Sequence, residues 1–313
     1  MSRPLIHILA TGGTIAGVSH TDHPAGRYTA GVRPVAPLLA AVPGLDDLAE
    51  LSADQILSLD SKDMRPADWQ SMLSACRRAL TSPAVDGVVI LHGTDTLEET
   101  AWFLHLTLPA GKPVVLTGAM RPADHPEADG PANILDAVRL ATLPEARDKG
   151  VLITLNGRIH GARSLRKYHA SQLDAFSSTQ YWNLARADGR FAAHDLAPLP
   201  RVDILAGYAG APACLVDACI NSGARGLVLA LAGQGSVPES WRPALARARD
   251  KGIPVIRASR CSGHIPRNGN ADDDGEGYLT AGDLPPLKAR IALMLALAAG
   301  MEQPEIQALL PTL

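Results

Sequence analysis

Two hydroxyl-rich turns contain the residues best suited to chemistry. In the first, ATGGTIAG at Ala10–Gly17, Thr14 follows two glycines that allow close backbone approach and expose N–H donors. In the second, HGTDTLEETA at His92–Ala101, Thr94 and Asp95 stand side by side. A threonine hydroxyl is a weak nucleophile that needs a base within reach, and a lysine can be that base. The two turns are therefore compatible with nucleophilic chemistry on a small polar substrate.

Each turn also has a purely structural interpretation. Two glycines after a strand are typical of a plain turn. Thr94, Asp95 and Thr96 are all good N-cap residues, and Thr96 with Glu99 matches a capping box. Capping needs only one of these residues, which leaves the others available for a substrate. Because G-x-G-x-x-G and P-loop patterns are absent, neither turn predicts a nucleotide, and we expect no cofactor.

Two further patterns are similar to metal sites. His20 and His23 are three apart in a segment that contains Gly and Pro, with no third ligand nearby. Asp272, Asp274 and Glu276 alternate as in a calcium loop. However, no helical pattern precedes these acids, and Asp283 rather than Glu occupies the twelfth position. We interpret the histidine pair as part of a solvated loop, do not expect the acids to bind calcium, and therefore expect no metal.

Strands that alternate with helices must position these two turns. Short apolar runs end repeatedly in Gly or small polar residues, and helical patterns lie between them, which predicts βαβ units and parallel sheets buried on both faces. The stretch 185–201 lacks periodicity and contains two prolines, which is typical of a linker. We therefore expect two α/β domains with mostly parallel sheets, at 1–184 and 202–313. The predicted strands are Leu5–Ala10, Val88–Leu91, Val114–Leu116, Val151–Leu155, Val202–Ala206, Leu227–Leu231 and Ile253–Ile256. The predicted helices are Asp68–Leu80, Thr96–Leu108, Asn133–Thr142, Ala211–Asn221, Pro238–Asp250 and Leu284–Ala299.

Composition narrows the class of partner. The 313 residues have a formal net charge of −3, so there is no overall basic character for a nucleic acid or an anionic membrane surface. The longest apolar run, Ile291–Ala299, is far shorter than the ~20 residues that cross a bilayer. Residues 1–4 lead directly into an apolar strand without a cleavage pattern, so we expect a cytoplasmic protein.

Four motifs together resemble the bacterial L-asparaginase family. They are the two turns above, GAMRP at Gly118–Pro122 and DGP-x-N at Asp129–Asn133. The resemblance extends over essentially the whole chain. It implies hydrolysis of a side-chain amide to acid and ammonia through an acyl-enzyme, without a cofactor.

The resemblance also implies roles for individual residues. Thr14 corresponds to the nucleophile and Tyr28, in the loop Gly17–Gly31, to its activating partner. Thr94, Asp95 and Lys167 correspond to a second catalytic trio. The substrate-binding positions are Ser61, which holds the α-carboxylate, Ala119, whose backbone contacts the scissile amide, and the turn glycines Gly13 and Gly93.

Three substrate-binding positions depart from the family pattern. After Ser61 the family usually has Gln or Glu facing the substrate ammonium, whereas this chain has Lys62. Ser236 stands where the family has an Asn contributed by the neighbouring subunit, and Asn270 stands where periplasmic members have a Glu. A cation beside an ammonium is unfavourable, so we expect Lys62 to turn away and pair with an acid such as Asp63 or one of Asp272–Asp274.

These features predict an L-asparagine amidohydrolase with weak glutaminase activity. The resemblance implies a homotetramer, a dimer of intimate dimers, whose sites form between neighbouring subunits. Three alternatives stay open: an ω-amidase for an acid that lacks the α-ammonium, a tRNA-dependent amidotransferase subunit, and a catalytically silent binding protein on the same fold. The amidotransferase subunits carry an extra N-terminal domain, whereas the first motif here begins at Ala10.

Overall fold

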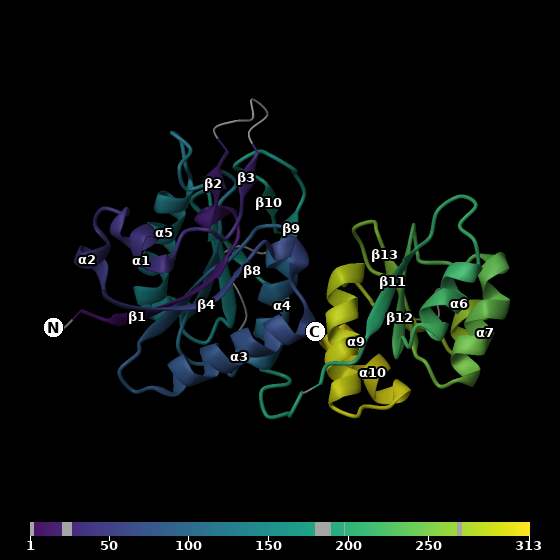
Figure 1. Ribbon diagram of the computed structural model, residues 1–313. Coiled ribbons are helices and arrows are strands. Elements are labelled where there is room, and N and C mark those ends of the chain that lie inside the picture. The colour runs from purple at the N-terminus through teal and green to yellow at the C-terminus, as the bar shows by residue number, and fades with distance from the viewer. Residues whose placement is uncertain (1–2, 21–26, 179–188, 197, 268–270) are drawn as a thin grey trace. The chain divides into compact units, whose positions relative to one another are not determined.

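The computed structural model describes residues 3–20, 27–178, 189–196, 198–267 and 271–313 (Figure 1). The chain forms two compact units, Met1–Ala193 and His194–Leu313, so the division falls within the segment predicted as a linker. Both units are α/β, and their sheets are mostly parallel, which confirms the predicted fold class.

The first unit is built on a six-stranded sheet in the order β4-β1-β5-β6-β7-β8. All neighbouring pairs are parallel except β7 and β8, which are antiparallel. The predicted strands of this unit are confirmed, whereas the long strand β4 was not predicted. The strands are β1 (Leu5–Gly12), β4 (Glu50–Leu59), β5 (Gly87–Leu91), β6 (Val114–Thr117), β7 (Val151–Leu155) and β8 (Arg158–Gly161).

Helices cover both faces of this sheet, as Figure 1 shows. On one face α3 (Pro66–Thr81) packs against α4 (Leu97–Thr107). On the other face α5 (Gly130–Thr142) packs on β5 and β6, with α1 (Val35–Ala40) and α2 (Leu45–Leu48) against it. Burial on both faces explains why β5, GVVIL, is a continuous apolar run.

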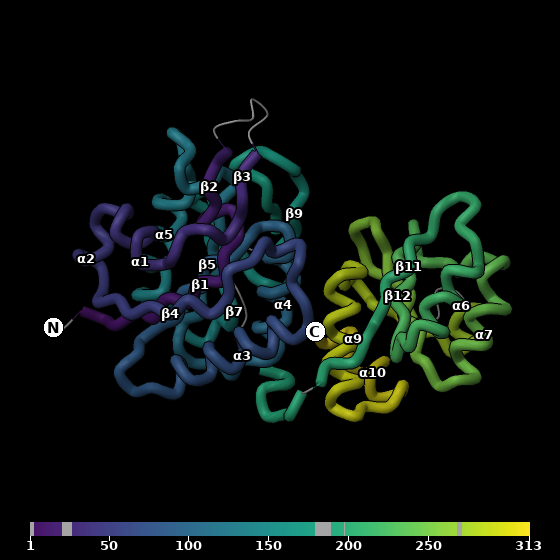
Figure 2. Tube along the Cα trace, viewed as in Figure 1, coloured from purple at the N-terminus to yellow at the C-terminus, as the bar shows by residue number. Residues whose placement is uncertain are grey.

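Short elements lie between the strands and helices. Two antiparallel hairpins are formed by β2 (Val18–Ser19) with β3 (Tyr28–Thr29) and by β9 (Arg166–Lys167) with β10 (Phe176–Ser177). In the tube of Figure 2, β2 and β3 run side by side. The single-turn 3-10 helices are η1 (Thr14–Ala16), η2 (Ser61–Asp63) and η3 (Pro144–Ala146).

The second unit is built on a fully parallel sheet in the order β11-β12-β13-β14. Its strands are β11 (Val202–Ala206), β12 (Gly226–Leu231), β13 (Val255–Ser259) and β14 (Leu279–Thr280). Helix α9 (Pro286–Ala298) lies on one face, and α6 (Cys214–Asn221) and α7 (Arg242–Asp250) pack together on the other (Figure 1). The remaining elements are α8 (Ala271–Gly275), α10 (Gln303–Leu309), η4 (Glu239–Trp241) and η5 (Leu310–Thr312).

The start of α4 differs from the sequence prediction. Thr96 is its N-cap residue, but its side chain caps no backbone N–H, so the capping-box prediction is wrong. The Thr96 hydroxyl instead donates to the carbonyl oxygen of Ser61 at 2.9 Å. A contact between two turns has therefore replaced a local cap.

None of the helices in the described part of the chain combines the length and the apolarity that a bilayer-spanning segment needs.

Candidate active site

Four adjacent strands of the first unit end at the same edge of its sheet. Ser61 follows β4, Thr14 follows β1, Thr94 follows β5 and Ala119 follows β6, and these strands are neighbours in the order β4-β1-β5-β6. In parallel sheets, ligands bind outside the carboxyl ends of the strands. The topology therefore gathers residues from four distant parts of the sequence at one candidate site.

The turns at this edge touch each other through glycine backbone. A Cβ atom added to Gly13, whose φ is +78°, would lie 2.3 Å from the Cα atom of Gly93. A Cβ atom added to Gly93 would lie 2.6 Å from Ser61 Oγ. Any side chain at either position would force the turns apart, so glycine is required here for close approach.

Thr14 and Tyr28 form the first polar pair. Thr14 Oγ1 and the Tyr28 hydroxyl are 2.7 Å apart, which is a hydrogen bond between two groups that can each donate or accept. Thr14 is buried, whereas Tyr28 is 39% exposed on β3. The hairpin that carries Tyr28 therefore brings its hydroxyl to the predicted nucleophile.

Thr94, Asp95 and Lys167 form the second polar group. Lys167 Nζ donates to Thr94 Oγ1 at 2.9 Å and pairs with Asp95 Oδ1 at 2.7 Å. The backbone N–H of Lys167 donates to Glu98 Oε2 at 3.0 Å. Glu98, for which the sequence indicated no role at the site, therefore anchors the strand that supplies the lysine.

Ser61 lies against this second group. Its Oγ atom accepts the Asp95 backbone N–H at 3.2 Å, which leaves the Ser61 hydroxyl hydrogen for another acceptor. A hydroxyl hydrogen in this position can donate to a substrate carboxylate.

Lys62 turns to neighbouring acids. Its Nζ atom lies 2.5 Å from Asp60 Oδ2 and 3.4 Å from Asp63 Oδ2, and its side chain is 61% exposed. The hydrogen bond to Asp60 raises the pKa of Lys62, desolvation opposes this rise, and the charges of Asp60 and Asp63 add to it. The lysine is therefore a neutralised cation, and its partners are Asp63, which was among the expected acids, and Asp60, which was not.

The turn that contains Ala119 is held by residues for which the sequence predicted no role. Asp129 accepts the backbone N–H groups of Met120 and Arg121, and Asn133 Nδ2 donates to the Gly118 carbonyl at 2.9 Å. Ala119 itself is fully buried. The motif DGP-x-N signals this function, because its Asp and Asn both bind the turn.

The backbone N–H groups near the two threonines differ in availability. The Gly13 N–H donates to the Leu59 carbonyl at 2.8 Å and is therefore committed. The N–H groups of Thr14 and Thr94 have no acceptor among the described residues. A substrate oxygen between these two turns can accept from them.

The two predicted positions outside the first unit have separate outcomes. Ser236 is an exposed residue in the loop that follows β12 of the second unit. Asn270 and His23 lie outside the described residues. No distance therefore relates these positions to Thr14 or Thr94.

The acids that are similar to a calcium loop are already matched by arginines. Asp274 lies 2.6 Å from Arg257, and Glu276 lies 2.6 Å from Arg242. Within the described residues no cluster of His, Cys, Asp and Glu is arranged to hold a metal ion.

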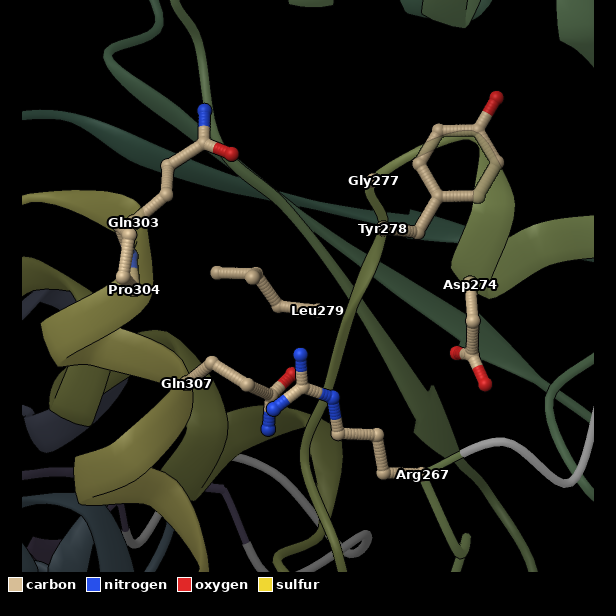
Figure 3. Close-up of a pocket in the computed structure, with 8 residues that line it drawn as sticks. All are labelled: Arg267, Asp274, Gly277, Tyr278, Leu279, Gln303, Pro304 and Gln307. Atoms are coloured by element: carbon tan, nitrogen blue, oxygen red, sulfur yellow. The ribbon is translucent and has the colours of Figure 1, made fainter.

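The second unit also contains a hollow of about 250 Å³ (Figure 3). In Figure 3, Leu279 points into it and the Tyr278 ring points away. The Gln307 amide oxygen accepts a hydrogen bond from the Thr280 backbone N–H. The hydroxyl among its lining residues, that of Tyr278, donates to Glu276 Oε2 at 2.6 Å, and the hollow has no threonine hydroxyls like those of the site in the first unit. Its other lining residues include Arg267, Asp274, Gln303 and Pro304.

Comparison with known proteins assigns both units. Residues 5–196 match the family model described as asparaginase, N-terminal, and residues 201–310 match the glutaminase/asparaginase C-terminal domain. The chain is 39% identical to L-asparaginase 2 of Bacillus subtilis over 97% of this chain and 85% of that protein. It is 36% identical to a probable periplasmic L-asparaginase of Haemophilus influenzae over 97% of this chain and 91% of that protein. The crystal structure of a probable cytoplasmic L-asparaginase from Campylobacter jejuni has a TM-score of 0.91 at 37% identity, with 100% of both chains covered.

Proposed function

The chain belongs to the bacterial asparaginase family, and we propose that it hydrolyses the side-chain amide of L-asparagine to L-aspartate and ammonia, with weak activity on glutamine. The observation that carries this proposal is the pairing of two threonine hydroxyls with partners at one sheet edge, Thr14 with Tyr28 and Thr94 with Lys167 and Asp95. The C-terminal family model, which covers glutaminases as well, supports the second activity.

Thr14 is the proposed nucleophile. Its Oγ1 atom attacks the amide carbon, its hydroxyl proton passes to the Tyr28 oxygen as the Tyr28 hydroxyl gives its own proton to the amide nitrogen, and the carbonyl oxygen becomes an oxyanion. The N–H groups of Thr14 and Thr94 are the proposed donors to that oxyanion. Collapse of this intermediate breaks the C–N bond, the nitrogen leaves as ammonia after taking up a proton, and an ester on Thr14 remains.

Thr94 and Lys167 serve the second half of the reaction. A water molecule oriented by the Thr94 hydroxyl, which Lys167 holds in place, attacks the ester carbon, and its proton passes through that hydroxyl to the Thr14 oxygen as the acid leaves. Asp95 keeps Lys167 in place through their contact at 2.7 Å.

The groups that bind the charged end of the substrate favour asparagine over an amide without an α-ammonium. Ser61, next to Asp95, offers a hydroxyl hydrogen to the α-carboxylate. Asp95 uses only Oδ1 for Lys167, which leaves Oδ2 for an ammonium. Lys62 is occupied by Asp60 and Asp63 and so does not oppose that ammonium. An ω-amidase would have no use for the open carboxylate oxygen.

The active unit is proposed to be a homotetramer in the cytoplasm, and Ser236 and Asn270 are proposed to complete a neighbouring subunit's site. The family resemblance supports the assembly. The structural relative from Campylobacter is described as cytoplasmic and the Haemophilus relative as periplasmic, so cell fractionation decides the compartment. Activity measured across a size-exclusion peak tests the assembly, because an active monomer contradicts it.

Ammonia release from asparagine, glutamine and succinamate tests the reaction. We expect asparagine to be the best substrate, and Thr14→Ala to lower kcat at least about a hundredfold with the fold retained. Mass spectrometry of the trapped acyl-enzyme should find the label on Thr14. A label on Thr94 reverses the two roles, and no release from any of the three amides favours the silent binding protein.

A further inference from the structure

A chain of three buried side chains lies directly behind the Gly93 turn. Trp69 Nε1 lies 2.9 Å from Thr100 Oγ1, Thr100 Oγ1 lies 3.1 Å from His92 Nε2, and His92 Nδ1 lies 2.6 Å from the Gly93 carbonyl oxygen. His92 and Thr100 are 0% exposed and Trp69 is 4% exposed. None of these residues has a role in the reaction described above.

The chemistry of the partners fixes the direction of every hydrogen bond. An indole N–H only donates, so Thr100 Oγ1 accepts from Trp69. A carbonyl oxygen only accepts, so His92 Nδ1 carries a hydrogen and donates to Gly93. In a neutral imidazole the other nitrogen then has a lone pair, and the Thr100 hydroxyl donates to His92 Nε2. Burial lowers the pKa of His92 to about 4, which keeps the ring neutral at physiological pH.

The Gly93 carbonyl and the Thr94 N–H belong to one peptide group. In a planar trans peptide these two bonds point in opposite directions. Because the carbonyl points to the buried His92 ring, the N–H points away from that ring. This N–H has no acceptor among the described residues, although Thr94 is only 5% exposed. A buried donor without a partner is costly unless a ligand satisfies it.

We propose that His92 is a positioning residue: its Nδ1–H, directed by Trp69 and Thr100, clamps the Gly93 carbonyl and so aims the Thr94 N–H at the oxyanion of the reacting amide. The oxyanion exists only after Thr14 attacks, so the clamp acts on the transition state and affects kcat rather than KM. Thr94 also bonds Lys167, so one peptide orientation serves both the N–H and the hydroxyl of this residue. The inference rests on the proposed amide hydrolysis.

The tautomer is measured first, without substrate. Long-range ¹H–¹⁵N correlation spectra of protein labelled with ¹⁵N-histidine should show one ring with a protonated Nδ1 and a bare Nε2. This ring should not titrate between pH 8 and pH 5, and its signals should vanish in His92→Asn. A protonated Nε2 on His92 overturns the proposal.

A matched pair of variants then tests the clamp. Asn places an N–H close to where His92 has Nδ1, whereas Leu has a similar size and no donor. We expect His92→Leu to lower kcat about tenfold or more with KM within about twofold, because loss of a whole oxyanion donor costs about 10² to 10³. His92→Asn should recover kcat to within about threefold of the parent. Equal kcat values for the two variants overturn the clamp, whether both are impaired or both are normal.

Thr100→Val tests the hydrogen-bonded chain from Trp69 through Thr100 to His92, because this substitution leaves the His92 ring in place. Loss of the donor to Nε2 should allow some Nε2–H tautomer, and kcat should fall in proportion. An unchanged kcat with a changed tautomer contradicts the proposal even if His92→Leu does not fold. If the wild type releases no ammonia from asparagine, the proposed substrate is wrong, and the same variants are compared on whichever amide the wild type hydrolyses.

Discussion

Asp273 is expected to be the most important single carboxylate for the stability of the second unit. It is 0% exposed and accepts from Arg242 Nη2 at 2.9 Å, from the Val237 backbone N–H at 3.2 Å and from Arg257 Nη1 at 3.4 Å. Arg257 is also fully buried. Substitution Asp273→Asn keeps the shape, removes the charge and directs an NH₂ group at one of these donors.

The contacts set the size of the effect. Two charge-assisted hydrogen bonds are worth about 1.5–3 kcal/mol each. Both arginines keep other partners, since Arg257 retains Asp274 and Arg242 retains Glu276 and Glu239. The loss therefore falls in the range of about 3–5 kcal/mol that is typical of breaking a buried pair.

Thermal unfolding measures this loss. The unfolding entropy is about 2.1 cal/mol/K per residue, so for a unit spanning His194–Leu313 the expected fall in Tm is about 12–20 °C if the unit unfolds alone. If the whole chain of 313 residues unfolds as one, the fall is about 5–8 °C. Calorimetry separates these two cases.

An exposed pair in the same unit provides the control. Asp217 bonds Arg247 at 2.7 and 2.9 Å, with side-chain exposures of 35% and 53%. Exposed pairs contribute at most about 1 kcal/mol, so Asp217→Asn should lower Tm by no more than about 4 °C if the unit unfolds alone and about 2 °C if the whole chain unfolds as one. Equal shifts for the two variants would refute the reasoning that burial, rather than geometry, determines the value of these ion pairs.

The other predictions concern the site and the response to pH. Tyr28→Phe should lower kcat about 10² to 10⁴-fold with KM retained, as expected for loss of a proton-transfer group; steady-state kinetics that change less than threefold contradict a proton role. Lys62→Gln should lower KM for asparagine with little change in kcat, because the new amide oxygen adds a contact to the substrate ammonium that the paired lysine does not make, whereas unchanged asparagine kinetics together with lost succinamate activity would favour an ω-amidase. The Tyr278 hydroxyl and then Arg242 lower the pKa of Glu276 below its usual 4.5, so this carboxylate stabilises the fold above that pH and the stability is lost as pH falls through the lowered pKa. Glu276→Gln should therefore lower Tm at pH 7, and the difference from the parent should shrink as the pH falls below the usual 4.5 and through the lowered pKa.

The sequence predicted the central strands because their environment is simple. Strands β1, β5, β6 and β7 are buried on both faces, so each is a short apolar run followed by a turn. Strand β4 was missed because it lies at the edge of the sheet and exposes polar residues such as Asp54 and Gln55. Ser61, which follows β4, could be identified from the sequence only through its match to the family motif.

The types of side chain at the strand ends could be predicted from the chain's own pattern, whereas the partners Tyr28 and Lys167 were predicted only through the family resemblance. Lys167 is 73 residues from Thr94, and only the β9 hairpin brings them together. The acids at 272–276 alternate as calcium ligands do, and the arginines that neutralise them come from β13 and α7. Spacing along the chain indicates which groups share an edge, whereas the pairing of charges depends on tertiary contacts.

The charge pairs of the candidate site are more exposed to solvent than those that stabilise the second unit. Asp95 is 55% exposed and Lys167 is 17% exposed, because a pair that handles a substrate must be reachable. Lys62 and its acids are also exposed, so salt screens their attraction. Asp273 and Arg257 are 0% exposed and are screened much less. Ionic strength therefore acts on substrate binding at the sheet edge while leaving the scaffold of the second unit almost unchanged, so KM responds to salt more strongly than Tm does.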